Sequence, residues 1–351
     1  MTGKSWRVAL AGCHRMLAPD PGSHNLAAAF AAVPGVQVEA IFDLGEETRA
    51  DFVECWRPLW GEVATYDNYQ RMLEEVAPDL LCIATRQTKH AEQIEAAVAA
   101  GVKGILCDKP LATTLEEMDR IVEACAETPL LLALERRWMA RYRFLRQCIA
   151  DGTIGRVTAI TVYGLPNLIN HGCHWYDAVL GLVGDVEPVW VSGLVDDIAA
   201  EPPDSRVHMD PPGKAQIGLA DGTVIYITSA GKHTHVRGTL SFDIAGEEGR
   251  LWVLDDAQEC YLWSGAQEED RLHRLQMPQE EGDWPTGRAM VQDLVQALET
   301  GGRTACDVHE ARRATEIGFA VHLSSAAGGK KIELPAVDRA LRIESFPWGN
   351  E

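Results

Sequence analysis

The first part of the chain alternates between short, uninterrupted apolar runs and longer stretches in which apolar residues recur at helical spacing. The apolar runs predict buried strands at residues 6–12, 36–42, 80–85, 103–107 and 129–134. The helical stretches lie at residues 27–33, 46–60, 68–76, 90–100 and 114–126. Strands that alternate with helices in this way indicate a parallel sheet, which binds ligands at the carboxyl ends of its strands. We therefore expect a Rossmann-like dinucleotide-binding domain over residues 1–128.

Beyond residue 128 the pattern changes to short β-rich runs separated by glycine or aspartate. These runs lie at residues 157–163, 214–229, 239–245, 249–254 and 259–263. A hairpin-like turn at residues 220–222 favours antiparallel pairing. Two helices follow, at 288–299 and at 309–326, and Asp307 and Glu310 form a capping box before the second. We expect residues 129–351 to form an α+β domain for substrate binding and oligomerisation, with a large, mostly antiparallel sheet. The fold class is therefore α/β.

Polar or conformationally special residues follow four strands of the predicted parallel sheet, namely Gly12, Asp43, Thr85 and Lys109. Gly12 permits a tight turn beside a pyrophosphate, but His14 stands where a Rossmann fingerprint has its second glycine, and its side chain would crowd the phosphates. Asp43 can accept hydrogen bonds from the adenosine ribose hydroxyls and would repel a 2′-phosphate, which favours NAD over NADP. The alternatives are an ordinary loop that binds no cofactor, and an Asp43 that caps the turn at Gly45.

Lys109 is the first candidate for chemistry. It directly follows the buried strand at 103–107, and Pro110 fixes the backbone behind it. Burial and a nearby nicotinamide cation would both lower the pKa of a lysine toward neutrality, which suits proton transfer from an alcohol. The alternative is a structural lysine paired with Asp108.

His171, His174 and Asp177 are spaced so that a helix would place them on one face. His174 could exchange a proton with the substrate while Asp177 fixes its orientation. Two alternatives remain open. One is a Zn or Mn site, with His208 or His235 as a further ligand. The other is a structural histidine whose hydrogen bonds are satisfied in a polar interdomain face.

Arg137 and Tyr163 are candidate substrate residues. Arg137, together with Arg136, could hold an anionic sugar, or could instead form interdomain salt bridges. Tyr163 and Trp175 could stack on a sugar ring, although aromatic residues in strands and helices commonly belong to the core.

Composition narrows the functional classes. The 351 residues exceed the usual size of a single core, so two domains are expected. The chain has 32 Lys+Arg against 52 Asp+Glu, and its net charge of -20 repels nucleic acid and anionic membranes. No apolar run approaches the roughly 18 residues of a membrane helix, and the start lacks a signal peptide's apolar region. Nine cysteines without a CxxC pair indicate reduced thiols. We expect a cytoplasmic protein without nucleic-acid or membrane partners.

Several motifs together resemble the Gfo/Idh/MocA family of sugar and polyol oxidoreductases. Residues 108–112, DKPLA, are similar to the family's EKP signature, and residues 170–177, NHGCHWYD, are similar to its catalytic segment. Residues 83–107, 136–157 and 328–335 follow the family's order as well. The resemblance implies that Lys109 contacts the nicotinamide ribose and the reacting hydroxyl. It also implies that His174 is the general acid/base, that Asp177 lies one helical turn beyond, and that Thr85 and His90 pass beside the cofactor.

One departure concerns the chemistry directly, because Asn170 stands where the family usually has a catalytic aspartate. An amide can orient a hydroxyl but cannot accept its proton. The sequence predicts NAD-dependent oxidation of a secondary hydroxyl of a sugar, sugar acid or cyclitol, or the reverse, in a homodimer or homotetramer. Asn170 would position the substrate. The alternatives are a lyase, hydratase or glycosidase-type enzyme with tightly bound NAD or a metal, and a non-catalytic sugar sensor.

Overall fold

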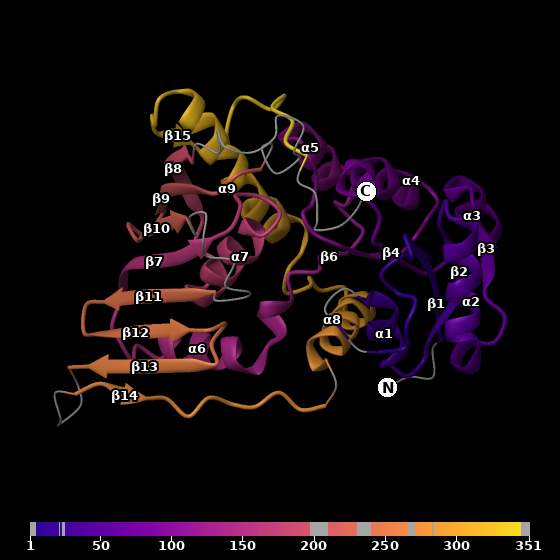
Figure 1. Ribbon diagram of the computed structural model, residues 1–351, viewed down its shortest axis with the longest axis horizontal. Helices are drawn as coiled ribbons and strands as arrows, with labels where there is room; N and C mark the ends of the chain where they lie inside the picture. Colours follow the sequence, from indigo (N-terminus) through magenta and orange to yellow (C-terminus); the bar gives the residue numbers. More distant parts are fainter. Residues whose placement is uncertain are drawn as a thin grey trace. The chain divides into compact units, whose positions relative to one another are not determined.

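The computed structural model describes residues 5–20, 22, 25–196, 210–229, 240–265, 271–282 and 284–344. The chain divides into two compact units. Figure 1 shows the chain coloured by residue number. Unit 1 comprises Met1–Ala112, Glu116–Trp138 and Glu281–Ala311. Unit 2 comprises Thr113–Leu115, Met139–Glu280 and Arg312–Glu351. Neither unit is one continuous stretch of the chain.

Six parallel strands form the sheet of unit 1, in the spatial order β3-β2-β1-β4-β5-β6. They are β1 (Trp6–Ala11), β2 (Val36–Phe42), β3 (Ala64–Tyr66), β4 (Leu80–Ile83), β5 (Gly104–Cys107) and β6 (Leu130–Leu132). The connecting helices are α1 (Leu26–Ala31), α2 (Glu46–Trp60), α3 (Tyr69–Val76), α4 (His90–Ala99) and α5 (Leu115–Ala124). The predicted Rossmann-like parallel sheet is confirmed. Only β3 was not anticipated, because its three residues are largely exposed and form no apolar run.

Unit 1 differs from the expected division after residue 128, because it extends to Trp138 and takes up helix α8 (Pro285–Thr300) from late in the chain. A Cβ atom on Gly104 of β5 would lie 3.0 Å from Leu298 and 3.2 Å from Leu294, so α8 packs directly against that strand. The amphipathic helix thus buries its apolar side within the core of unit 1.

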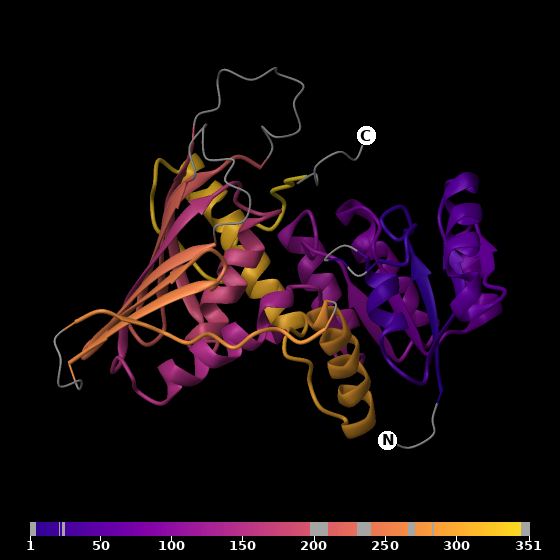
Figure 2. The ribbon, with the colours of Figure 1, turned by 60° about the horizontal axis from the view of Figure 1, so that its bottom comes forward.

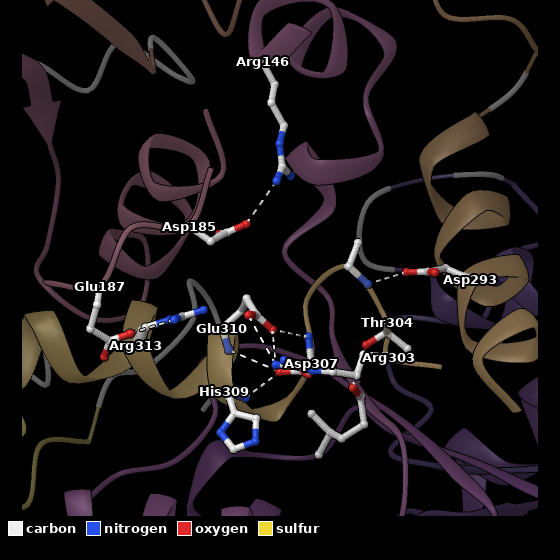
Figure 3. A network of polar contacts seen from close by, with 12 residues as sticks. Arg146, Asp185, Glu187, Asp293, Arg303, Thr304, Asp307, His309, Glu310 and Arg313 are labelled. Atoms are coloured by element: carbon white, nitrogen blue, oxygen red, sulfur yellow. Dashed lines mark hydrogen bonds and ion pairs between the residues drawn. The ribbon is translucent and has the colours of Figure 1, made fainter. Parts of the chain in front are cut away.

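A polar network fixes the return of the chain from α8 to helix α9 (Val308–Ala326), as Figure 3 shows. Asp307 accepts a hydrogen bond from the backbone N–H of His309 at 2.7 Å, and Glu310 accepts one from the N–H of Asp307 at 3.2 Å. The predicted capping box is therefore present. Arg303 pairs with both carboxylates and holds the pKa of Asp307 below its usual range, because the guanidinium favours the charged form.

Nine strands form the sheet of unit 2, in the order β14-β13-β12-β11-β7-β10-β9-β8-β15. They are β7 (Val157–Leu165), β8 (Pro188–Val195), β9 (Gly213–Leu219), β10 (Val224–Ser229), β11 (Ser241–Gly246), β12 (Gly249–Leu254), β13 (Glu259–Ser264), β14 (His273–Arg274) and β15 (Ile332–Glu333). Only β7 and β10 pair in parallel, among the strands described. The predicted mostly antiparallel sheet is confirmed.

One face of this sheet forms the core of unit 2. A row of paired residues crosses it from Ile217 through Ile225, Ile160 and Ile244 to Leu251, all almost fully buried. Helices α6 (Ala140–Ala150), α7 (Gly172–Leu182) and α9 cover this face (Figure 2). Because side chains alternate along a strand, the neighbouring residues point to the opposite, outer face of the sheet.

Candidate active site

In unit 1, the candidate cofactor residues follow four adjacent strands. The order β2-β1-β4-β5 places the strand ends before Asp43, Gly12, Thr85 and Lys109 side by side along one edge of the sheet. This is the carboxyl edge, where parallel α/β sheets bind their ligands.

The glycine-poor loop after β1 is held by side chains. Gly12 has a φ of +85°, and a Cβ there would lie 2.6 Å from the carbonyl oxygen of Ala84, so only glycine fits. Cys13 and Met16 are buried, whereas His14 is exposed. The indole of Trp56 on α2 donates to the carbonyl oxygen of Met16 at 2.7 Å. Trp56 thus fixes the backbone of the loop at Met16. No local sequence pattern indicates this hydrogen bond.

Asp43 ties two backbone segments together at the end of β2. One carboxylate oxygen accepts the N–H of Cys13 at 2.8 Å, and the other accepts the N–H of Gly45 at 2.9 Å. The turn-capping interpretation is therefore correct. It does not exclude a role in cofactor binding, because each carboxylate oxygen has a second lone pair for a ribose hydroxyl. Together with burial, the Asp43 carboxylate raises the pKa of Cys13, which keeps this cysteine a thiol.

His90, at the start of α4, joins the loop after β4 to the segment after β5. Its Nδ1 lies 3.0 Å from the carbonyl oxygen of Pro110, and its Nε2 lies 3.2 Å from that of Thr85. The ring is almost completely buried, and burial lowers its pKa. His90 therefore contacts two backbone segments, at Thr85 and at Pro110. The hydroxyl of Thr85 donates a hydrogen bond to Gln93 at 2.5 Å.

Lys109 is half-buried and begins immediately after β5. Its backbone N–H donates to the carboxylate of Asp108 at 2.8 Å, and its peptide bond to Pro110 is cis. With the contact of His90 to Pro110, the backbone of the DKP segment is fixed on both sides of the lysine.

In unit 2, the turn at 167–171 leads into α7, which carries His174 and Asp177. Asn167 accepts the N–H of His171 at 2.7 Å, and its amide lies 2.9 Å from the Nδ1 atom of the same histidine. Asn170 and Asp177 are buried, with 2% and 1% of their surface exposed, whereas His171 and His174 are half-buried. The helix predicted from the spacing of these residues is present.

The remaining candidate residues lie elsewhere. Tyr163 of β7 is 44% exposed and follows the core residue Val162, so it points to the outer face of the sheet, away from the face that α7 covers. The stacking of Tyr163 on a sugar ring stays a prediction. Arg137 is half-buried in unit 1, on the short helix η2 (Glu135–Trp138).

Within the described ranges, no three or more His, Cys, Asp and Glu side chains gather in a group that could hold a metal ion. His208 and His235, the possible further ligands, lie outside the described residues. Among the helices described, none combines the length and apolar character needed to cross a bilayer.

Residues 6–135 match a family model, GFO_IDH_MocA, described as "Oxidoreductase family, NAD-binding Rossmann fold". This region is similar to the Gfo/Idh/MocA family. The resemblance inferred from the sequence motifs is thereby confirmed for the stretch that carries Gly12, Asp43 and Lys109. The Rossmann sheet of unit 1 is the family's NAD-binding fold.

Two relatives are similar to parts of this chain. The 1,5-anhydro-D-fructose reductase of Ensifer adhaerens is 38% identical over 99 residues, which are 28% of this chain and 29% of the relative. The D-apiose dehydrogenase of Paraburkholderia graminis is 30% identical over 156 residues, which are 44% of this chain and 39% of the relative. The chain thus matches well under half the length of each relative.

The likeness in fold covers nearly the whole chain. The solved structure of levoglucosan dehydrogenase, in complex with NADH and levoglucosan, has a TM-score of 0.77 and covers 95% of this chain and 100% of its own. The identity is 20%, so this likeness shows the fold alone. Both units therefore share the architecture of that dehydrogenase.

Proposed function

We propose that the protein is an NAD-dependent oxidoreductase that oxidises a secondary hydroxyl of a sugar, sugar acid or cyclitol, or catalyses the reverse reduction. The observation that carries the proposal is the carboxyl edge of the unit 1 sheet, where Asp43 and Lys109 follow β2 and β5 of a family-specific NAD-binding fold. The relatives named above are a reductase and a dehydrogenase of carbohydrates. They favour redox chemistry over the lyase, hydratase, glycosidase and sensor alternatives.

The residues of unit 1 fit a dinucleotide. The Asp43 carboxylate is partly exposed and is fixed in place by two N–H groups, so it can receive the adenosine ribose hydroxyls. Its charge disfavours a 2′-phosphate. Thr85 and Lys109 would lie along the same edge toward the nicotinamide. When bound, NAD supplies the acceptor for the hydride that leaves the carbinol carbon.

Residues of the chain itself would transfer the proton and orient the substrate. We assign proton transfer at the reacting hydroxyl to Lys109 and His174, as the family resemblance implies. Asp177 would orient the imidazole of His174, because it is buried one helical turn beyond it. Asn170 cannot accept a proton, so its amide would hold a hydroxyl in place.

Replacing Asp43 by asparagine (D43N) tests the cofactor assignment. We expect the dissociation constant for NAD to rise about 10- to 100-fold, because a charge-assisted hydrogen bond to a ribose hydroxyl is worth about 1.5–3 kcal/mol. The discrimination against NADP should shrink at the same time. Isothermal titration with NAD and with NADP measures both effects.

Asp79 offers a matched control at the opposite edge of the same sheet. Its carboxylate also accepts a backbone N–H, from Arg7 at 3.1 Å, and pairs with Lys103. D79N removes the same charge and should leave NAD affinity unchanged. If the wild type bound neither dinucleotide, or if D43N bound NAD like the wild type, the cofactor assignment would be wrong.

We also propose that the outer face of the nine-stranded sheet joins two copies of the chain. Large apolar side chains on this face are half-exposed or exposed: Tyr163, Trp190, Leu194, Tyr226, Trp252, Leu254, Tyr261 and Trp263. The described helices of unit 2 cover only the other face (Figure 2). Burying a large apolar side chain contributes about 1.5–3 kcal/mol, so pairing this face with a second copy is strongly favourable. We therefore propose a homodimer or homotetramer.

Tyr226 lies on β10, beside the central strand β7, and Y226D should shift the protein toward monomer, because it would bury an unpaired carboxylate in the interface. Sedimentation velocity measures the shift. V337D, at an exposed valine outside the outer face, is the control and should leave the oligomer intact. A monomeric wild type, or an intact Y226D oligomer, would contradict the assignment.

The nine free cysteines support a reducing compartment, and we propose the cytoplasm.

A further inference from the structure

We infer that Asp210 is a positioning residue for the proposed reaction, and that it holds the backbone of Asn170 and the start of α7 from outside the helix. The inference rests on the proposed function for its catalytic consequence. Asp210 precedes β9 and is only 3% exposed. One carboxylate oxygen accepts the N–H of Ile169 at 2.9 Å, and the other accepts the N–H of Asn170 at 2.8 Å.

These two hydrogen bonds lie at a position where a carboxylate stabilises the first turn of a helix. The N–H of Cys173 donates to the carbonyl oxygen of Ile169 at 3.1 Å, so a helical turn already begins at Ile169. The N–H groups of the first turn of a helix have no partner within the helix, and they carry its positive dipole end. Asp210 therefore caps the turn that leads into α7, from a segment that lies about 40 residues further along the chain.

The neighbouring contacts leave the turn little freedom. The N–H of Leu168 donates to the carbonyl oxygen of Pro211 at 3.1 Å, and the N–H of His171 is capped by Asn167. On the other side, a Cβ on Gly318 of α9 would collide with the carbonyl oxygen of Leu168, so α9 and the turn are in close contact. The backbone N–H groups from 168 to 171 are all bound, and Asp210 holds the central two.

Two further side chains connect Asp210 to the helices around it. The Nε2 atom of His322, one helical turn beyond Gly318 on α9, lies 3.9 Å from the Asp210 carboxylate. Tyr176 of α7 is fully buried, and its ring lies over the start of the helix, where a Cβ on Gly172 would be 2.9 Å away. Asp210 is therefore the charged centre between the turn, α7 and α9. Its two hydrogen bonds hold the backbone of Asn170, in the turn that leads to His174.

The test is the D210N variant, because an amide of the same shape offers one acceptor oxygen and turns an NH₂ group toward the second N–H. We expect kcat for the sugar to fall about 10- to 100-fold, since small displacements of positioning groups cost factors of this size. The KM for the sugar should change less than about threefold, and NAD affinity, a property of unit 1, should stay unchanged. Hydrogen exchange of the amides at 168–171 should become faster.

D196N is the matched control, since Asp196 lies at the other end of the same connection between β8 and β9. Its carboxylate pairs with Lys214 at the surface, at 3.0 Å. It should keep wild-type kcat and amide protection. If D210N kept wild-type kcat, or lost NAD affinity and unfolded, the positioning role would be overturned. If the wild type bound no NAD and did not turn over, while D210N still lost amide protection, the proposed function would fail and Asp210 would be a purely structural cap.

Discussion

Replacing Lys109 by methionine (K109M) is expected to lower kcat about a thousandfold. Methionine keeps the length of the side chain but removes its charge and its proton-carrying nitrogen, and positioned acid–base groups contribute about 10²- to 10⁴-fold. The backbone of the segment does not depend on the side chain, because the N–H of Lys109 binds Asp108 and His90 contacts Pro110. The fold of unit 1 should therefore survive, and NAD affinity should change much less than kcat. Steady-state formation of NADH over a panel of sugars and cyclitols, with titration of NAD, separates the two effects.

Lys103 provides a control at the other end of β5. It precedes β5, whereas Lys109 follows it, and it pairs with Asp79 at the surface at 2.6 Å. K103M removes a lysine from the amino edge of the sheet, where no ligand is expected. It should keep wild-type kcat. A K109M enzyme with full turnover would remove the catalytic assignment and leave the fold assignment intact.

The sequence predicts unit 1 well because of the physics of parallel sheets. Strands buried on both faces appear as continuous apolar runs, so β4 and β5 could be predicted directly. Strand β3 could not, because an exposed edge of three residues has no such run. Helix α8 could be predicted as a helix but not as part of unit 1. Its partner β5 lies far away in the sequence, and only the three-dimensional packing against Gly104 connects them.

The candidate site shows the same limit. Asp43 and Lys109 could be found because strand ends are visible in the sequence and the carboxyl edge is where ligands bind. Of the two backbone hydrogen bonds of Asp43, the one to Gly45 could be predicted because it closes a local turn. The one to Cys13 could not, because Cys13 is distant in the sequence. Asp210 gave no signal at all. It lies in a segment rich in proline and aspartate, and its partners at Ile169 and Asn170 share no periodicity with it.

Replacing His174 by glutamine (H174Q) should lower kcat about 10²- to 10³-fold and should also change its dependence on pH. Glutamine can still form hydrogen bonds but cannot exchange a proton. In the direction of oxidation a histidine base acts only when neutral, so the wild-type rate should rise with pH as the imidazole of His174 loses its proton. That rise should be absent in H174Q. In K109M it should persist, because the imidazole remains. The measurement is the pH profile of kcat for the two variants and the wild type.

His309 is the matched control, because it also lies in the first turn of a helix but is exposed and belongs to the capping region of α9 (Figure 3). H309Q should have the wild-type rate and pH profile. If H174Q retained the rise with pH, the titrating base would be another group. Asn170 cannot be that group, since its amide does not titrate, so Lys109 is then the remaining one of the two residues to which we assign proton transfer. A loss of turnover together with an unchanged pH profile would therefore assign proton transfer to unit 1 alone and orientation of the substrate to the turn that Asp210 holds.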